Sequence, residues 1–223
     1  MSLMDRISTI NRQYLHEEVV GQLRELILSG HLEPRSRVNE SQLCQRFDIS
    51  RTPLREAIKL LAAEGLLELI PNRGARVAAI SAAEIDEVLA VVAALEGAAG
   101  ELACSHITDE EIAALEALQI QMEAAWRAHE AERYFAINRQ VHETIMLASR
   151  NAALQGVYGL MSGRIQRARY SAHKTPEQWG QAIADHVEML KLLRARDGAE
   201  LGALMRRHIR SKKPIISAAF GKA

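Results

Sequence analysis

Three histidines have the residue type and the helical placement of a metal site. His142, His186 and His208 each fall inside a segment of helical periodicity and have an aliphatic neighbour. Asn138 precedes His142 by four residues, so these two side chains share a helical face. Three imidazoles and one amide oxygen would suit zinc, nickel or another divalent metal. Lone helical histidines are also common as ordinary core or surface residues, so the spacing alone leaves both interpretations open.

A second cluster lies in the sequence ISRTPLREAI, residues 49–58. Ser50 has the type of a helix N-cap, and Pro53 suits the first helical turn. Arg51 and Arg55 then place positive charge at the end of the helix that is already positive, which opposes its macrodipole. A phosphate or a guanine edge would supply the missing compensation. The alternative is solvated surface charge paired with a neighbour such as Glu56.

Further polar groups could share a surface with these arginines. The hydroxyls of Ser50 and Thr52, with the free N–H groups of the first helical turn, suit phosphate oxygens. Arg35 and Arg37 in the preceding turn, and Arg73 at a predicted hairpin tip, can flank the same surface. The sequence therefore predicts a DNA contact at the start of this helix.

The first third of the chain supplies the elements that would hold these groups. Helical spacing of apolar residues covers 15–29, a short helix is expected over 39–47, and a third helix over 50–64 buries Leu54, Ile58 and Leu61. The apolar runs LLELI and ARVAAI, separated by PNRG, predict a β-hairpin. Three helices followed by a hairpin make a winged helix-turn-helix, in which the third helix can enter the major groove of DNA.

The remainder is predicted to be helical throughout. Helices are expected over residues 83–105, 108–129, 130–149, 151–171, 176–196 and 198–213. The predicted fold is therefore mostly α: a winged helix-turn-helix over 1–80, then an all-α antiparallel bundle of about six helices over 81–223. We expect DNA binding in the first domain, and dimerisation, sensing or catalysis in the second. Trp126 and Trp179 fit either packing positions or the walls of a pocket.

Composition limits the class of protein. Hydrophobic residues make up 48% and charged residues 25%, as in globular domains, and the net charge of zero neither favours nor excludes nucleic acid. Cys44 and Cys104 stand far apart, which favours a reducing compartment. The N-terminal residues lack the apolar core of a signal peptide, and the longest apolar run, 88–95, is shorter than the ~20 residues that span a bilayer. We expect a cytoplasmic protein with no membrane partner.

Residues 15–79 closely resemble the DNA-binding domain of GntR-family bacterial transcription regulators. The resemblance is carried, in order, by SRTPLREA, the following L-x-x-E-G-L and the NRG turn. It implies a homodimer on a near-palindromic double-stranded operator. It also implies that the operator is contacted by one set of residues: Arg35, Ser50, Arg51, Thr52, Arg55, Asn72, Arg73 and Gly74.

Residues 84–213 resemble the FadR-type C-terminal ligand-binding domain, also called FCD, of one GntR subfamily. The residues that carry this are ALEGAAGELA, NRQVHETIMLASRNAAL, ADHVEMLKLLRARDGAEL and MRRHI. The resemblance implies that Asn138, His142, His186 and His208 hold a divalent metal, with zinc or nickel as the leading candidates. It also implies a small-molecule effector bound nearby. Asn138 stands where Asp is common in the subfamily, which implies a weaker ligand.

One position departs from the family pattern. The subfamily often has an arginine four residues before a glutamate of the first bundle helix; here the glutamate is Glu96 and the position holds Val92. If that arginine binds a carboxylate effector, this chain uses another base or a less anionic ligand. The candidate substitutes are Arg139, Arg164, Arg167 and Arg169. Each of these also fits a solvated or dimer-facing position.

These observations predict a homodimeric, sequence-specific transcription regulator controlled by a small metabolite, with carboxylates among the candidates, bound at or near a metal. A metalloenzyme is disfavoured because HExxH is absent: Met146 stands where His142-Glu143 would require the second histidine. Nucleotide-binding and serine-hydrolase motifs are absent as well. A direct metal sensor remains a third hypothesis, which operator binding titrated against free metal would separate from the first.

Overall fold

The computed structural model describes the backbone of residues 12–79, 82–171, 175–214 and 216. Side chains are described for residues 16–79, 84–163, 175, 177–214 and 216. The chain divides into two compact units, Met1–Ala78 and Ala79–Ala223. Each unit has its own core, so each is considered by itself.

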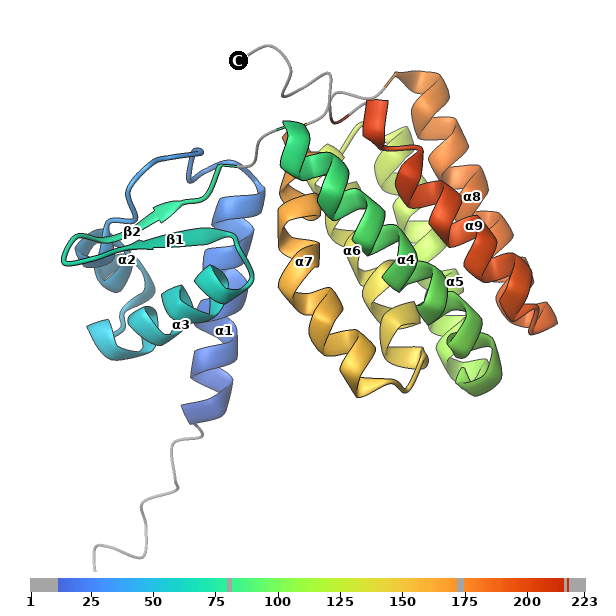
Figure 1. The fold of residues 1–223 in the computed structure, drawn as a ribbon, viewed down its shortest axis with the longest axis horizontal. Helices are drawn as coiled ribbons and strands as arrows, with labels where there is room; N and C mark the ends of the chain where they lie inside the picture. Colours follow the sequence, from blue (N-terminus) through green and yellow to red (C-terminus); the bar gives the residue numbers. More distant parts are fainter. Residues whose placement is uncertain (1–11, 80–81, 172–174, 215, 217–223) are drawn as a thin grey trace, which may run out of the picture. The chain divides into compact units, whose positions relative to one another are not determined.

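In its described residues, from Arg12 on, the N-terminal unit consists of three helices and a hairpin (Figure 1). Its elements are α1 (Arg12–Leu28), α2 (Glu40–Phe47), α3 (Arg51–Ala63), β1 (Leu67–Ile70) and β2 (Gly74–Val77). The strands pair antiparallel, from Leu67 opposite Val77 to Ile70 opposite Gly74. Leu23, Leu54 and Leu61 are fully buried where α1 meets α3, which leaves the opposite face of α3 in solvent.

A tight turn sets the start of α3. Asn39 caps α2 by accepting a hydrogen bond from the Gln42 N–H, at 3.1 Å. The helix ends at Asp48, which takes a left-handed conformation (φ 53°), and the Ile49 N–H bonds back to the Cys44 carbonyl. Asp and Asn tolerate this conformation better than most residues. The chain therefore needs only two residues between the end of α2 and the N-cap of α3.

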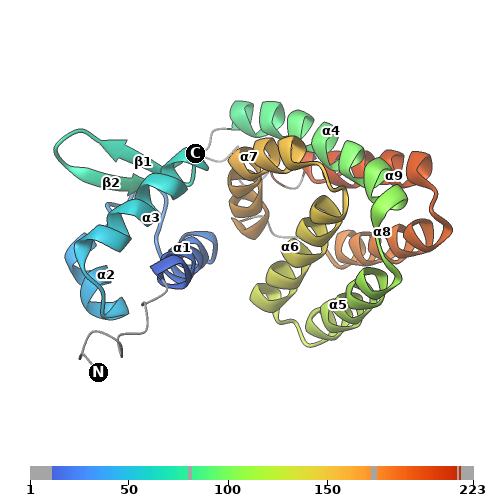
Figure 2. The ribbon, with the colours of Figure 1, turned by 90° about the horizontal axis from the view of Figure 1, so that it is seen from below.

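The second unit is a bundle of helices. In the described part of the chain these are α4 (Ala82–His106), α5 (Asp109–Arg127), α6 (Ala131–Ala148), α7 (Ala152–Ser171), α8 (Pro176–Ala195) and α9 (Gly198–Arg210). Figure 2 shows α4 and α9 side by side along one side of the bundle, with α5, α6 and α8 beyond them. The predicted fold class, a winged helix-turn-helix followed by about six bundle helices, is confirmed.

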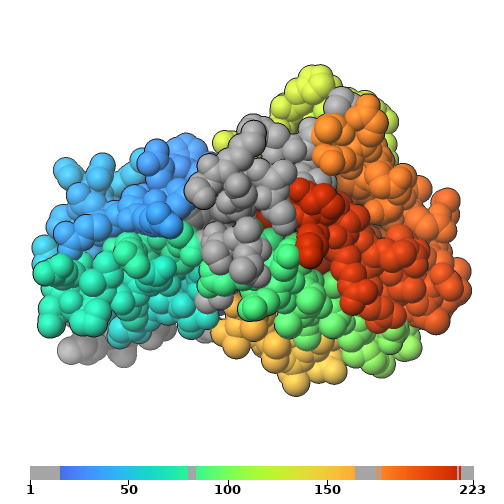
Figure 3. Space-filling view, turned by 45° about the horizontal axis from the view of Figure 1, so that its top comes forward, coloured from blue at the N-terminus to red at the C-terminus, as the bar shows by residue number. Residues whose placement is uncertain are grey.

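Helices α4 and α9 touch almost backbone to backbone. A methyl group added at Gly202 would lie 2.8 Å from the Gly97 carbonyl oxygen, and one added at Gly198 would lie 2.7 Å from the Glu101 carbonyl oxygen. Both are shorter than ordinary contacts, so these positions require glycine. The two helices form adjoining strips on the bundle surface in Figure 3. This contact fixes α9, which carries His208, against α4, which carries Glu96.

The helix α4 is apolar enough, by length and composition, to cross a membrane. It is the one such helix in the described residues, and 56% of its most apolar window is buried inside the bundle. Leu89, Val92 and Ala93 lie in an apolar cluster with residues of α6, α7 and α9. Its hydrophobicity is thus used in the core of this unit.

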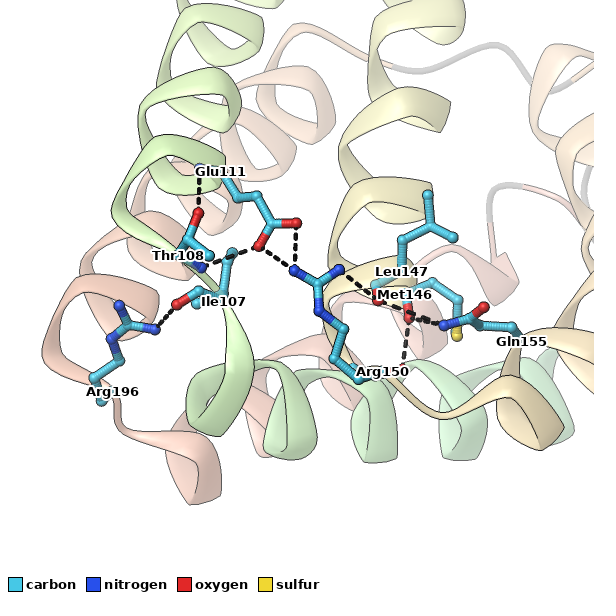
Figure 4. A network of polar contacts seen from close by, with 9 residues as sticks. Ile107, Thr108, Glu111, Met146, Leu147, Arg150, Gln155 and Arg196 are labelled. Atoms are coloured by element: carbon cyan, nitrogen blue, oxygen red, sulfur yellow. Dashed lines mark hydrogen bonds and ion pairs between the residues drawn. The ribbon is translucent and has the colours of Figure 1, made fainter.

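Capping contacts tie the ends of α5 and α6 together (Figure 4). Thr108 accepts a hydrogen bond from the Glu111 N–H at 3.2 Å, and the Glu111 carboxylate accepts one from the Thr108 N–H at 3.0 Å. Arg150, just after α6, donates to both oxygens of Glu111, at 2.7 and 2.8 Å. This reciprocal capping box is a strong helix start, and its carboxylate also joins two helices.

Candidate metal centre and nucleic-acid interface

Helices α6, α8 and α9 bring three histidines together inside the bundle. His142, His186 and His208 are each 1% exposed, and the ligand atoms that each offers all lie within 4.8 Å of one another. Their ring centroids are 5.0 to 5.4 Å apart. These residues are 44 and 22 positions apart along the chain (186−142 and 208−186), so only the bundle packing could assemble them.

Two of the imidazoles are oriented by carboxylates, one buried (Glu96) and one partly buried (Asp185). His142 Nδ1 lies 2.6 Å from Glu96 Oε2, and His208 Nδ1 lies 2.8 Å from Asp185 Oδ2. A carboxylate can only accept, so in each neutral ring Nδ1 carries the proton and Nε2 keeps its lone pair. Glu96 is itself 1% exposed and also accepts from the Tyr158 hydroxyl at 3.2 Å. Carboxylate–histidine pairs of this kind orient metal ligands in proteins.

One further observation, at Nε2 of His142, supports the fit of these donor atoms to a metal ion. His142 Nε2 is buried and has no hydrogen-bond partner among the described residues. A buried acceptor left in this way costs free energy, and a metal bound at about 2.0–2.1 Å would satisfy it. Three nitrogens would be supplied by the histidines. Asn138, one turn before His142 on α6, is 7% exposed and can offer a fourth, oxygen donor.

Of the four predicted effector arginines, the structure describes the side chain of Arg139. Arg139 is half-buried on α6, whereas the side chains of Arg164, Arg167 and Arg169 lie outside the described residues. Val92 is 1% exposed in the apolar cluster of α4, so this position contributes packing. A carboxylate ligand would therefore need a base from elsewhere.

Asp185 and Tyr158 were missed by sequence reasoning. Asp185 bonds to His208, 23 residues away, although it is adjacent to His186 in sequence. Tyr158 reaches Glu96 across 62 residues. Sequence spacing carries no signal for such contacts between helices. A weak signal existed only for Glu96, because a carboxylate in the middle of a very apolar helix needs a buried partner.

The arginine tip of α3 lies at the surface of the first unit. Arg51 and Thr52 are exposed, and Ser50 occupies the N-cap position without a side-chain capping hydrogen bond in the described structure. Arg55 is 60% exposed and donates from Nε to Glu40 Oε2 at 2.8 Å. That hydrogen bond to Glu40 is the main reason the pKa of Arg55 is raised. Glu56, the partner considered from the sequence, pairs with Lys59 instead.

The hairpin tip and the turn before α2 lie beside each other. Arg35, Asn72 and Gly74 have positive φ angles (64°, 59° and 83°), and all three are exposed. The Arg35 N–H donates to the Val77 carbonyl at 2.9 Å, and Arg37 donates to the carbonyl of the exposed Arg73 at 2.9 Å.

Glu40 connects this tip to α3. A methyl group added at Gly74 would lie 3.4 Å from Glu40 Oε1, while Glu40 Oε2 accepts from Arg55. Arg55 and the hairpin tip are thus neighbours on one surface.

Comparison with known proteins agrees with this arrangement. Residues 15–77 match the family described as bacterial regulatory proteins, gntR family, and residues 87–211 match the FCD domain. The Nta operon transcriptional regulator of Aminobacter aminovorans is 30% identical over 188 residues, covering 82% of this chain and 86% of that protein. An uncharacterized HTH-type transcriptional regulator of Bacillus subtilis, YdhC, is 32% identical over 137 residues, and the match spans 61% of each chain.

A solved structure, E. coli McbR/YncC, superposes with a TM-score of 0.81 at 22% identity, covering 91% of this chain and 96% of that one. The likeness shows a shared fold. The family and the relatives are transcription regulators and not enzymes. With the exposed start of α3 in one unit and a buried histidine cluster in the other, this chain belongs to the GntR family of DNA-binding transcription regulators and carries an FCD effector domain.

Proposed function

We propose that the protein is a homodimeric cytoplasmic regulator whose operator affinity is set by a small metabolite bound at a metal in the bundle. Residues 1–80 would bind DNA, and residues 81–223 would bind the metabolite and the second subunit. The observation that carries the proposal is the buried three-histidine cluster with its two carboxylate supports. A cluster of this kind has no evident use in DNA binding, and FCD domains can bind metal.

In the first unit, α3 would enter the major groove of a near-palindromic operator. Arg51 and Arg55 would reach base edges, with the hydroxyls of Ser50 and Thr52 on phosphates. Arg35 and the tip formed by residues 72–74 would touch the backbone or the minor groove. Their exposure and the shared surface described above support this assignment.

In the bundle, His142, His186, His208 and Asn138 would hold the metal, with zinc or nickel as candidates. Three imidazoles and an amide oxygen add no negative charge, so a bound divalent metal would act as a Lewis acid that favours oxygen ligands from an anionic effector. Glu96 and Asp185 would keep Nε2 of His142 and His208 aimed inward. Arg139, with Arg164, Arg167 and Arg169 as further candidates, would complement a carboxylate.

Dimerisation is supported by an exposed apolar stripe on α4 and α7. Val91, Val157 and Leu160 are 42%, 45% and 50% exposed. Beside them, Gly156 and Gly159 have no atom within 4 Å of the place where a methyl group would stand. Large exposed aliphatic groups next to bare backbone suit close contact with another helix. We propose that the second subunit packs here, and replacement of Val157 by Glu would then shift the protein toward monomer in light scattering.

The decisive experiment measures operator binding in three states: metal-stripped, metal-loaded, and metal-loaded with candidate carboxylates. We expect His186→Ala to lose the metal in elemental analysis and to lose the response to the carboxylate. His106→Ala, an exposed histidine outside the cluster, should keep both. A response to metal alone, with no organic ligand, would indicate a direct metal sensor instead. Retention of metal by His186→Ala would refute the assigned ligand set.

A further inference from the structure

A cavity separate from the three-histidine cluster lies at one end of the bundle. It forms where α5 passes into α6, beside the first turn of α8, and has a volume of about 310 Å³. Its lining includes Trp126, His129, Glu130, Tyr134 and Trp179, and none of the three clustered histidines. This volume is at the lower end of the range for small-molecule sites, roughly 300–1,000 Å³.

The walls of this cavity are aromatic in a chain that has few aromatics. Only 4% of the residues are Phe, Trp or Tyr, yet both tryptophans of the chain line this one cavity. The rings of Tyr134 and Trp179 are 4.3 Å apart at an interplanar angle of 81°, so they form two walls of a corner. Tyr134 is fully buried, and its ring also packs edge-on against Phe135 at 5.6 Å. The corner is therefore anchored in the core.

The fixed charge in the lining is negative. Glu130 is the N-cap residue of α6, but its side chain makes no capping hydrogen bond. The carboxylate is exposed at the mouth of the cavity, and Oε2 pairs with Arg133 at 3.0 Å. Arg133 is itself outside the lining. Because both partners of this pair are about half exposed, solvent weakens it. The cavity therefore presents aromatic rings, one carboxylate and the imidazole of His129.

We propose that this cavity binds a small methylated ammonium ion, with the cation against the rings of Trp126 and Trp179 and Glu130 at the rim. The faces of Trp and Tyr rings attract cations, and cages of such rings recognise quaternary ammonium groups. A primary ammonium would require three hydrogen-bond acceptors, whereas a methylated ammonium needs few and gains from burying its methyl groups. The exposed side chains of the lining that can accept are His129 and Glu130, and Glu130 already pairs with Arg133, which favours the methylated ion.

This site goes beyond the proposed metal-dependent function and does not require the metal. The two sites share α6: Tyr134 precedes Asn138 by one helical turn and His142 by two. A ligand in the cavity would therefore lie next to Tyr134, which is on the helix face that carries the proposed metal ligands. A cationic ligand here and an anionic one at the metal would be chemically distinct inputs.

The chain carries its own reporter for the test, since both tryptophans are at the site. Full-length protein is titrated with choline chloride, and separately with 3,3-dimethylbutan-1-ol, which has a carbon in place of the charged nitrogen. We expect a saturable change in tryptophan fluorescence with choline and at least tenfold weaker binding of the neutral alcohol. Sodium chloride at equal ionic strength is the control and should leave the emission unchanged.

Variants then locate the site. Glu130→Gln keeps the shape of an exposed side chain and should weaken choline binding about three- to tenfold, whereas Glu132→Gln, a nearby carboxylate outside the lining, should bind like wild type. Trp179→Ala, followed by calorimetry with circular dichroism as the folding check, should abolish binding. Equal affinity for choline and the neutral alcohol would overturn the proposal, as would the absence of saturation. Metal-stripped protein and His186→Ala should bind choline normally, which separates this test from that of the metal.

Discussion

The two units of the chain use charged and polar groups in opposite ways. In the N-terminal unit Arg51 and Arg55 are held in solvent above an apolar core, and Arg55 pairs with a single carboxylate. In the bundle the polar groups lie in the core. There Glu96 is hydrogen-bonded to His142, and Asp185 to His208, and these groups are largely shielded from solvent. Binding and stability should therefore be separable in the first unit and coupled in the second.

Metal removal is expected to give the largest effect among the tests of this contrast. A ligand present at 100 times its Kd stabilises a folded protein by about 2.7 kcal/mol. For a chain of this size each kcal/mol corresponds to about 2–4 °C. We therefore expect chelation to lower the melting temperature of the bundle by roughly 5–10 °C in differential scanning calorimetry. His186→Ala should melt at the chelated value with or without zinc. Identical melting of loaded and stripped protein would break the proposed coupling.

The second test concerns the arginine tip. Arg51→Ala and Arg55→Ala should each lower specific operator affinity by about 5–150-fold, as expected when an arginine loses a guanine edge. Because both side chains are exposed, the melting temperature should stay unchanged. Arg127→Ala, an exposed arginine on α5, is the matched control and should bind operator normally. A large loss of stability in either tip variant would contradict the separation.

A third, smaller effect is expected at the α5 cap. Thr108→Ala should reduce the free energy of unfolding by about 1 kcal/mol, measured in urea, with operator affinity retained. The pKa of Glu111 is lowered, first by the Thr108 N–H and then by Arg150. The pKa of Glu111 is thus lower in the folded than in the unfolded state. The stability that the Glu111 carboxylate contributes is therefore present at neutral pH and is lost as the pH falls through the acidic range. A stability difference between wild type and Glu111→Gln that persisted in acid would contradict this sign.

The smallest effect is expected at Glu40. Exposed ion pairs contribute little, so Glu40→Gln should change specific operator affinity by less than about fivefold. Removing the carboxylate also removes a negative charge near DNA phosphates, so binding to non-specific DNA should tighten and the ratio of specific to non-specific affinity should fall. Filter binding on both DNAs measures this ratio. An unchanged ratio would show that Glu40 has no part in orienting Arg55.

The helix boundaries and the winged helix-turn-helix were predictable from sequence because local signals define them. Asn39, Thr108 and Thr175 cap helices through their own side chains, and PNRG lies at the hairpin turn. The three histidines lie together, as the resemblance to the FCD domain implied, whereas helical spacing alone had left this open. The supports of the site were not predictable: Asp185 reaches His208, and Glu96 reaches both His142 and Tyr158, through the packing of separate helices. Likewise, the sequence did not decide whether the two tryptophans are packing residues or pocket walls. The packing of the bundle helices places both at one cavity.

The glycine contact between α4 and α9 has a mechanical consequence. Because methyl-sized space is missing between the backbones at Gly198 and Gly202, neither helix can turn about its own axis without collision, so we expect the two helices to tilt together as a rigid pair. His208 lies near one end of α9, and α4 starts at Ala82, a few residues after the DNA-binding unit ends at Ala78. We therefore expect a displacement of His208 to move the start of α4 directly, by a rigid tilt of the two helices, without successive rearrangements of side chains.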